Sequence, residues 1–87
     1  MDIKKNVQEQ EINTTTLQVT HRHLKVPEQV YLQSVNHLDP WNEAAYQEFI
    51  QKYLDEINDG GIVGMVRVRR ESPYVYFDAA IRYPHGE

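Results

Sequence analysis

Two histidines flank an arginine in His21-Arg22-His23, a spacing that could support metal chemistry. Side chains at positions i and i+2 of a β-strand project from the same face of the sheet. Two imidazoles in this arrangement can begin a transition-metal site, with His37 or Asp39 as the third ligand. Neither candidate has a fixed spacing from the pair, and the sequence lacks a His-Glu-x-x-His motif. We therefore expect no bound metal and no cofactor, with both histidines on a polar strand surface.

Basic and aromatic side chains gather on both sides of the turn-like segment Glu71-Ser72-Pro73. The candidate contact residues are Arg67, Arg69, Tyr74, Tyr76 and Arg82. Tyrosine and arginine anchor protein interfaces, and on a sheet face they can also contact phosphates and stack on bases. Because the chain as a whole is acidic, we expect a protein partner rather than direct contact with nucleic acid.

Acidic side chains are concentrated in residues 39–59, where six carboxylates face one lysine. Those expected on the acidic helix surface are Glu43, Glu48, Asp55, Glu56 and Asp59. Such a surface could imitate a phosphate backbone and occupy a partner that binds nucleic acid. The alternative is an ordinary solvated helix face.

The chain has 87 residues, a formal net charge of −4 with neutral histidines, and no cysteine. Its length allows one domain, since domains average roughly 150 residues. The lack of cysteine excludes a disulfide framework and a cysteine-ligated zinc site. No apolar run approaches the ~18 residues of a membrane span, and the N-terminus lacks the apolar segment of a secretory signal. We therefore expect a cytoplasmic protein with no membrane contact.

The elements that position these side chains begin after residues 1–13, which are polar and predict a flexible tail. Residues 14–87 then form a single domain. Residues 14–26 are rich in β-branched side chains and predict a strand with a bulge near 20–23, or two short strands. Residues 27–38 fit a strand or a helix opening at Pro27, and we favour the strand for its β-forming side chains.

Residues 40–58 give the clearest helical pattern. Asp39 is the expected N-cap, Pro40 suits the first turn, and Gly60 follows the end. Glu48 and Lys52 are spaced to form an i,i+4 ion pair. The apolar stripe comprises Ala45, Tyr46, Phe49, Ile50, Tyr53, Leu54 and Ile57.

Residues 62–83 predict a β-hairpin whose register follows from alternation alone. Pairing Glu71 with Tyr74 and advancing one residue on each strand makes one face apolar and the other mostly polar. The polar face then carries a cross-strand pair of Arg67 and Asp78. The remaining pairs are Arg69–Tyr76, Met65–Ala80, Val63–Arg82, Val68–Phe77, Val66–Ala79, Gly64–Ile81 and Ile62–Tyr83. In this register Val63 and Met65 form an exposed apolar patch.

Together these patterns predict an α+β fold, in which the 40–58 helix packs on one face of a small antiparallel sheet. The expected core combines the helix stripe with the apolar sheet positions. Those positions are Leu17, Val19, Val66, Val68, Phe77, Ala79 and Ile81.

Residues 21–30, His-Arg-His-Leu-Lys-Val-Pro-Glu-Gln-Val, resemble the strand and Pro-Glu entry of ribbon-helix-helix DNA-binding proteins. The resemblance implies a dimer in which His21, His23 and Lys25 point into the DNA major groove from a two-stranded ribbon. The 40–58 helix would then correspond to that family's second helix.

We expect a non-enzymatic protein that acts by occupying the surface of a partner protein. Serine nucleophile motifs and phosphate-binding loops are absent from the sequence. In composition the chain resembles small acidic phage-encoded inhibitors, anti-CRISPR proteins among them, which suggests a nucleic-acid-handling protein as the partner. A homodimer is an open possibility. The alternatives, in order, are a ribbon-helix-helix regulator and a metal-dependent enzyme.

Overall fold

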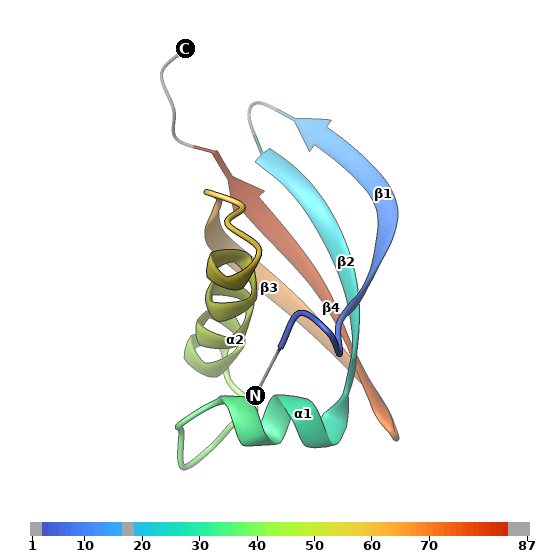
Figure 1. Ribbon diagram of the computed structural model, residues 1–87, viewed down its shortest axis with the longest axis vertical. Helices are drawn as coiled ribbons and strands as arrows, with labels where there is room; N and C mark the ends of the chain where they lie inside the picture. The colour runs from blue at the N-terminus through green and yellow to red at the C-terminus, as the bar shows by residue number, and fades with distance from the viewer. Residues whose placement is uncertain (1–2, 17–18, 84–87) are drawn as a thin grey trace.

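Four strands and two helices make up the fold, in a computed structural model that describes residues 3–16 and 19–83 (Figure 1). The elements are β1 (Gln8–Thr16), β2 (Val19–Pro27), α1 (Glu28–Ser34), α2 (Glu43–Glu56), β3 (Ile62–Glu71) and β4 (Tyr74–Arg82). All strand pairs are antiparallel, in the order β1-β2-β4-β3. The predicted α+β class and C-terminal hairpin are confirmed, and a second helix joins the expected one. Within the described residues, neither helix is long and apolar enough to span a bilayer.

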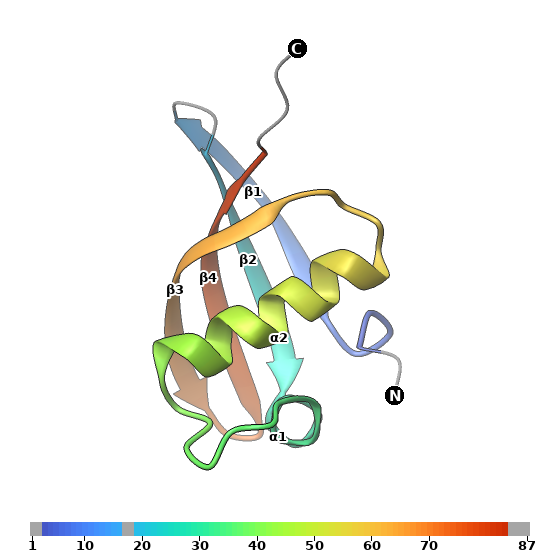
Figure 2. The ribbon, with the colours of Figure 1, turned by 90° about the vertical axis from the view of Figure 1, so that its left-hand side faces the viewer.

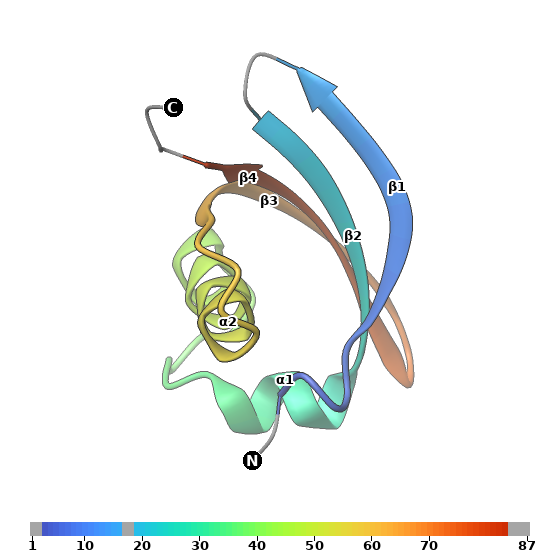
Figure 3. The same ribbon diagram turned by 45° about the horizontal axis from the view of Figure 1, so that its top comes forward.

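Both helices belong to one side of the sheet. Helix α2 crosses the sheet obliquely, while α1 lies at the end where β2 finishes (Figure 2). The sheet curves around α2, and no helix or strand of the described residues covers its opposite side (Figure 3). We call the side facing α2 the inner face and the opposite side the outer face.

The core lies between α2 and the inner face. Alternate residues of β4 are fully or almost fully buried, as expected for a strand with one face against a core. The buried apolar residues are Ile3, Leu24, Val26, Tyr31, Val35, Ala45, Phe49, Ile50, Tyr53, Leu54, Val66, Val75, Phe77, Ala79 and Ile81. Tyr46, Ile57 and Val68 from the predicted core are partly buried and pack against this cluster.

Helix α2 is shorter than the predicted 40–58 helix because it begins after a different cap. The Asn42 side chain accepts a hydrogen bond from the Ala45 N–H at 2.9 Å. The expected cap, Asp39, instead accepts from the Trp41 N–H at 3.0 Å. The helix ends at Glu56, and Asn58 has a φ of 55° before Gly60 is reached.

The favoured strand over 27–38 is wrong, because residues 28–34 form helix α1. Proline at position 27 ends β2 and suits the start of a helix, as the alternative required. The helix turns Tyr31 into the core, where its ring packs against Phe49, Phe77 and Trp41. Burial of this one large ring outweighs the modest β preference of its neighbours.

The predicted tail over 1–13 is also wrong for the described residues 3–13. Ile3 is only 5% exposed and belongs to the core, and β1 pairs with β2 from Gln8 onward. The backbone N–H groups of Ile3 and Lys4 donate to the Glu56 carboxylate at 3.3 and 3.0 Å. Residues 14–16 and 19–26 belong to two different strands, β1 and β2, so the alternative of two short strands is closer to the structure than one strand over 14–26. The irregularity in pairing lies between Gln10 and Thr14 rather than near residues 20–23.

The hairpin register is confirmed from Val66 to Glu71, including Arg67 opposite Asp78. Between Val63 and Val66 a bulge in β3 shifts the register, so that Val63 pairs with Ile81 rather than with Arg82. Val63 therefore faces inward and packs against the core. Val19 is a predicted core residue, but its position in β2 is out of phase with that of the inward-facing Leu24 and Val26. Its side chain therefore lies on the outer face. Leu17 lies outside the described residues.

Candidate functional site

The outer face collects most of the side chains singled out in the hairpin. Alternation along β4 places Tyr74, Tyr76, Asp78, Ala80 and Arg82 on this side, opposite the buried positions. Pairing with β2 and β3 sets further polar side chains beside them. These are His21, His23, Lys25, Arg67, Arg69 and Glu71.

Near the hairpin turn, cations lie over the aromatic rings of the outer face. Lys25 Nζ is 4.1 Å from the centroid of the Tyr74 ring, and Arg69 Cζ is 4.6 Å from that of Tyr76. Arg69 also pairs with Glu71 at 2.7 Å. Both rings are half-buried, so this end of the face presents covered aromatic surface and positive charge.

At the other end, the outer face becomes apolar. Met65 is 63% exposed and Ile62 is 42% exposed. Met65 lies on this side by alternation with buried Val66, and the bulge in β3 brings Ile62 to the same side. They border a hollow of about 320 Å³ shared with Val19, Ala80 and Arg82. Sequence reasoning predicted an apolar patch here from Met65 and Val63, but the bulge exchanges Val63 for Ile62.

A second hollow, of about 310 Å³, lies between these two ends. Polar side chains line it on three strands: His23, Arg67, Arg69, Tyr76 and Asp78. Although Arg67 lies opposite Asp78 in the register, the expected ion pair is not formed. Within the described residues, Arg67 has no ion-pair partner.

One oxygen of Asp78 is buried and accepts no hydrogen bond from the part of the chain that is described. His21 Nδ1 and His23 Nε2 lie 3.9 and 3.8 Å from this Oδ1 atom, beyond hydrogen-bond distance. The predicted sharing of one face by the two histidines is confirmed. The two imidazoles and the Asp78 carboxylate therefore lie together as a polar cluster on the outer face.

The residues considered as a third metal ligand are engaged elsewhere. His37 Nε2 lies 2.6 Å from Glu48 Oε1, and Asp39 accepts from Trp41. Among the described residues, no three histidine or acidic side chains come together in a way that could hold a metal ion.

The acidic residues of α2 are used within the fold. Glu43 Oε2 accepts from the Val66 N–H at 3.0 Å, and Asp55 accepts from Gln51 at 3.2 Å. Glu48 pairs with Lys52 at 2.8 Å, which confirms the expected i,i+4 pair, and with His37. The hydrogen bond from Lys52 is the largest cause of the lowered pKa of Glu48. Since Glu56 holds the N-terminal segment, all four carboxylates already have partners.

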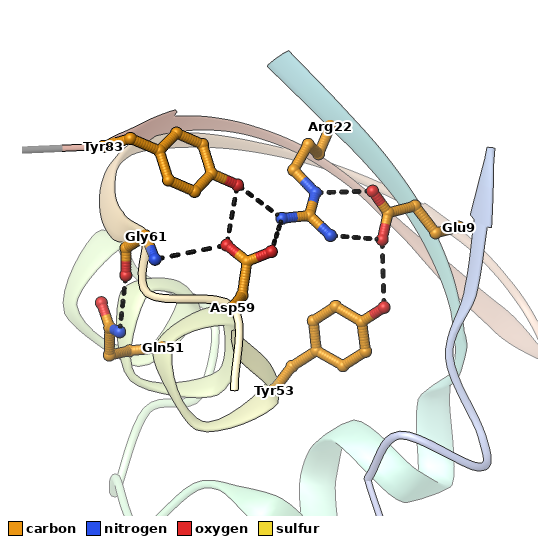
Figure 4. A network of polar contacts seen from close by, with 7 residues as sticks. All are labelled: Glu9, Arg22, Gln51, Tyr53, Asp59, Gly61 and Tyr83. Atoms are coloured by element: carbon orange, nitrogen blue, oxygen red, sulfur yellow. Dashed lines mark hydrogen bonds and ion pairs between the residues drawn. The ribbon is translucent and has the colours of Figure 1, made fainter. Parts of the chain in front are cut away.

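A polar network that the sequence did not reveal lies on the inner face at the C-terminal end of α2 (Figure 4). Arg22 forms two hydrogen bonds with Glu9, at 2.6 and 2.8 Å, and one with Asp59 at 2.7 Å. Tyr83 donates to Asp59 at 2.7 Å, and Tyr53 donates to Glu9 at 3.0 Å. The network joins β1, β2, α2 and the segments that follow α2 and β4.

Electrostatics in this network favour the charged carboxylates and the neutral phenols. Burial alone would raise the pKa of Asp59, but hydrogen bonds from Tyr83 and Arg22 hold it below its usual value. Burial and the hydrogen bond to Glu9 raise the pKa of Tyr53 to about 12. With every charge paired, the network stabilises the fold and leaves no carboxylate free to act as a base.

Comparison with protein-family models, with curated proteins and with solved structures finds no match for this chain. The candidate site therefore stands on its geometry alone. That geometry brings together Arg67, Arg69, Tyr74 and Tyr76 on the outer face, with Arg82 at the apolar end. It keeps Glu43, Glu48, Asp55 and Glu56 apart from them, on α2.

Proposed function

We propose that this chain is a non-enzymatic, cytoplasmic binding protein that acts by occupying the surface of a partner protein through its outer sheet face. The observation that carries the proposal is the exposed pair Ile62 and Met65, bordered by Arg67 and Arg82. Apolar patches rimmed by polar residues are typical of interaction sites. Tyrosine and arginine are the side chains that contribute most to such interfaces.

The same face supports a protein partner over a nucleic acid. Lys25 and Arg69 lie over the rings of Tyr74 and Tyr76, which leaves less open aromatic surface for base stacking. The Asp78 carboxylate lines the hollow of this face, and its negative charge disfavours a phosphate backbone and favours hydrogen-bond donors. Backbone N–H groups and side chains of a protein supply donors readily.

The acidic helix and the ribbon-helix-helix resemblance give less support. The α2 carboxylates are engaged within the chain, so the proposal does not rest on imitation of a phosphate backbone. Strand β2 is paired on both sides, by β1 and by β4. His21, His23 and Lys25 therefore lie inside a four-stranded sheet, with no free edge at which a second chain could complete a two-stranded ribbon.

The test is affinity capture from source-cell lysate with matched variants of the immobilised chain. Met65→Glu places a charge in the apolar end of the outer face, and Leu38→Glu makes the same kind of change at an exposed position between the helices. We expect Leu38→Glu to retain the same protein as the unmodified chain, and Met65→Glu to retain at least tenfold less. A tenfold loss corresponds to about 1.4 kcal/mol, well within the range of an interface anchor.

Thermal melting of each variant distinguishes a loss of partner binding from a loss of folding. Met65 is exposed, so Met65→Glu should shift the melting temperature by no more than a few degrees. Equal capture by both variants would contradict the proposal. So would capture that disappears after nuclease treatment, because the partner would then be held through nucleic acid.

A further inference from the structure

The free edge of β3 divides into a covered half and an open half. Three side chains one helical turn apart on α2 reach the backbone of its first half: Glu43, Gln47 and Gln51. Glu43 accepts from the Val66 N–H, and Gln47 Nε2 donates to the Gly64 carbonyl at 2.8 Å. Gln51 accepts from the Val63 N–H at 3.1 Å and donates to the Gly61 carbonyl at 3.2 Å. This half of the edge is already satisfied.

The open half lies closer to the hairpin turn. Since the Val66 N–H points away from β4 and the register runs without a break to Glu71, the backbone groups of Val68 and Arg70 also point away from β4. No contact of the kind made by α2 reaches these two residues within the described chain. Unpaired backbone groups on an edge strand are a template for one further strand.

Charge identifies which strand fits. Positions 67–71 carry three arginines and one glutamate, a local net charge of +2 in a chain whose total is −4, and of these arginines Arg69 pairs with Glu71 and Arg70 with Glu28. Arg67 and Arg69 lie on the outer face beside the open half, and Arg67 has no ion-pair partner among the described residues. A second copy of β3 would set arginine against arginine, and like charges on neighbouring strands are destabilising.

We infer that the open half of the β3 edge binds an extended acidic segment of the partner protein as a fifth strand. The segment's backbone pairs with Val68 and Arg70, and its alternate carboxylates lie beside Arg67 and Arg69. This inference rests on the proposed function and specifies the chemistry of the partner.

The probe is a fluorescein-labelled peptide, Glu-Val-Asp-Val-Glu-Val-Asp, followed by fluorescence anisotropy at low and at physiological salt. We expect measurable binding that weakens with salt. The peptide Lys-Val-Lys-Val-Lys-Val-Lys should not bind. Backbone N-methylation at alternate positions of the acidic peptide should reduce its affinity about fivefold or more, because each methyl removes a pairing donor while the charges remain.

Two pairs of protein variants separate backbone pairing from charge. Val68→Pro and Val68→Ala both lose the valine side chain, but only the proline loses the outward N–H, without breaking a bond to β4. Arg67→Glu and Lys4→Glu make the same charge change, the first beside the open half of the edge and the second at an exposed position of the N-terminal segment. We expect Val68→Pro and Arg67→Glu to weaken binding about tenfold, and each matched control to change it less than about threefold.

Amide hydrogen exchange locates the bound peptide. Exchange at Val68 and Arg70 should slow on binding, while exchange at Met65 and Ile62 should not change. No binding by the acidic peptide, equal affinity of the N-methylated peptide, or equal affinity of Val68→Pro and Val68→Ala would overturn the inference. In those cases the capture result with Met65→Glu still decides the proposed function, so the two failures are distinguishable.

Discussion

Arg22 lies between two histidines in the sequence, but its side chain is on the opposite face of the sheet. Strand alternation sends His21 and His23 to the outer face and turns Arg22 inward, toward Glu9 and Asp59. The side chain of Arg22 is only 12% exposed, and those of Glu9 and Asp59 are 23% and 18% exposed. Its guanidinium group therefore ion-pairs with two carboxylates that have limited access to water, and the three side chains together keep a net charge of −1.

Replacing this arginine should cost far more stability than replacing an exposed one. Arg22→Met keeps the apolar stem but leaves Glu9 and Asp59 with no cation between them, which should lower the free energy of unfolding by about 2–3 kcal/mol. The matched Arg82→Met change is on an exposed position and should cost less than about 0.5 kcal/mol. Urea unfolding measures both. Equal losses would show that the network adds nothing to stability.

At the scale of elements, α2 contacts the rest of the fold through two neighbouring stripes of side chains. Its apolar stripe fills the core, as the periodicity predicted, and its neighbouring polar stripe covers part of the β3 edge. The covered segment, Ile62 to Val66, is mostly apolar. An exposed apolar edge strand invites pairing between molecules, so we expect these polar contacts to disfavour self-association through this half of the edge.

Removing the polar stripe should therefore expose the edge. We expect the triple variant Glu43→Ala, Gln47→Ala, Gln51→Ala to remain folded and to self-associate with rising concentration. Gln29→Ala together with Gln33→Ala removes exposed polar side chains from α1 and serves as the control. Sedimentation velocity measures the association. A triple variant with the same sedimentation behaviour as the control would contradict a protective role.

The elements also show what the sequence could and could not predict. The α2 stripe and the register from Val66 to Glu71 were predictable, because each depends on neighbouring residues with a regular period. The bulge that places Ile62 rather than Val63 on the outer face was not predictable. The sequence indicates an alternating pattern but not the position at which the alternation is interrupted. The covering of the edge by Gln47 and Gln51 joins residues that only the folded chain brings together.

At the scale of the whole molecule, buried tyrosines couple the fold to alkaline pH. Burial raises the pKa of Tyr31 in α1 and of Tyr83 after β4, and with the hydrogen bond to Glu9 it raises that of Tyr53 in α2 to about 12. An unfolded tyrosine titrates near 10. The folded state therefore binds more protons than the unfolded state between these two values, and its stability must fall as pH rises through them.

We expect the free energy of unfolding to be nearly constant from pH 7 to 9 and to fall steeply between about pH 10 and 12. Tyr53→Phe removes one titrating group and should make this fall shallower, by up to about 2–3 kcal/mol at pH 12. Urea unfolding at a series of pH values checks the slope, and tyrosinate absorbance follows ionisation. Identical slopes for the two proteins would contradict the contribution of Tyr53.

The strand order has a further consequence, for the way the chain folds. Strands β1 and β2 are neighbours in sequence, as are β3 and β4, but the pairing of β2 with β4 joins distant residues. Val26 and Val75 pair although 49 positions separate them, from 75 minus 26. Closing a loop of this size costs roughly 3.5 kcal/mol of chain entropy before any contact repays it. Formation of the two local hairpins is thus cheaper than their joining, and we expect the pairing of β2 with β4 to be the rate-limiting step of folding.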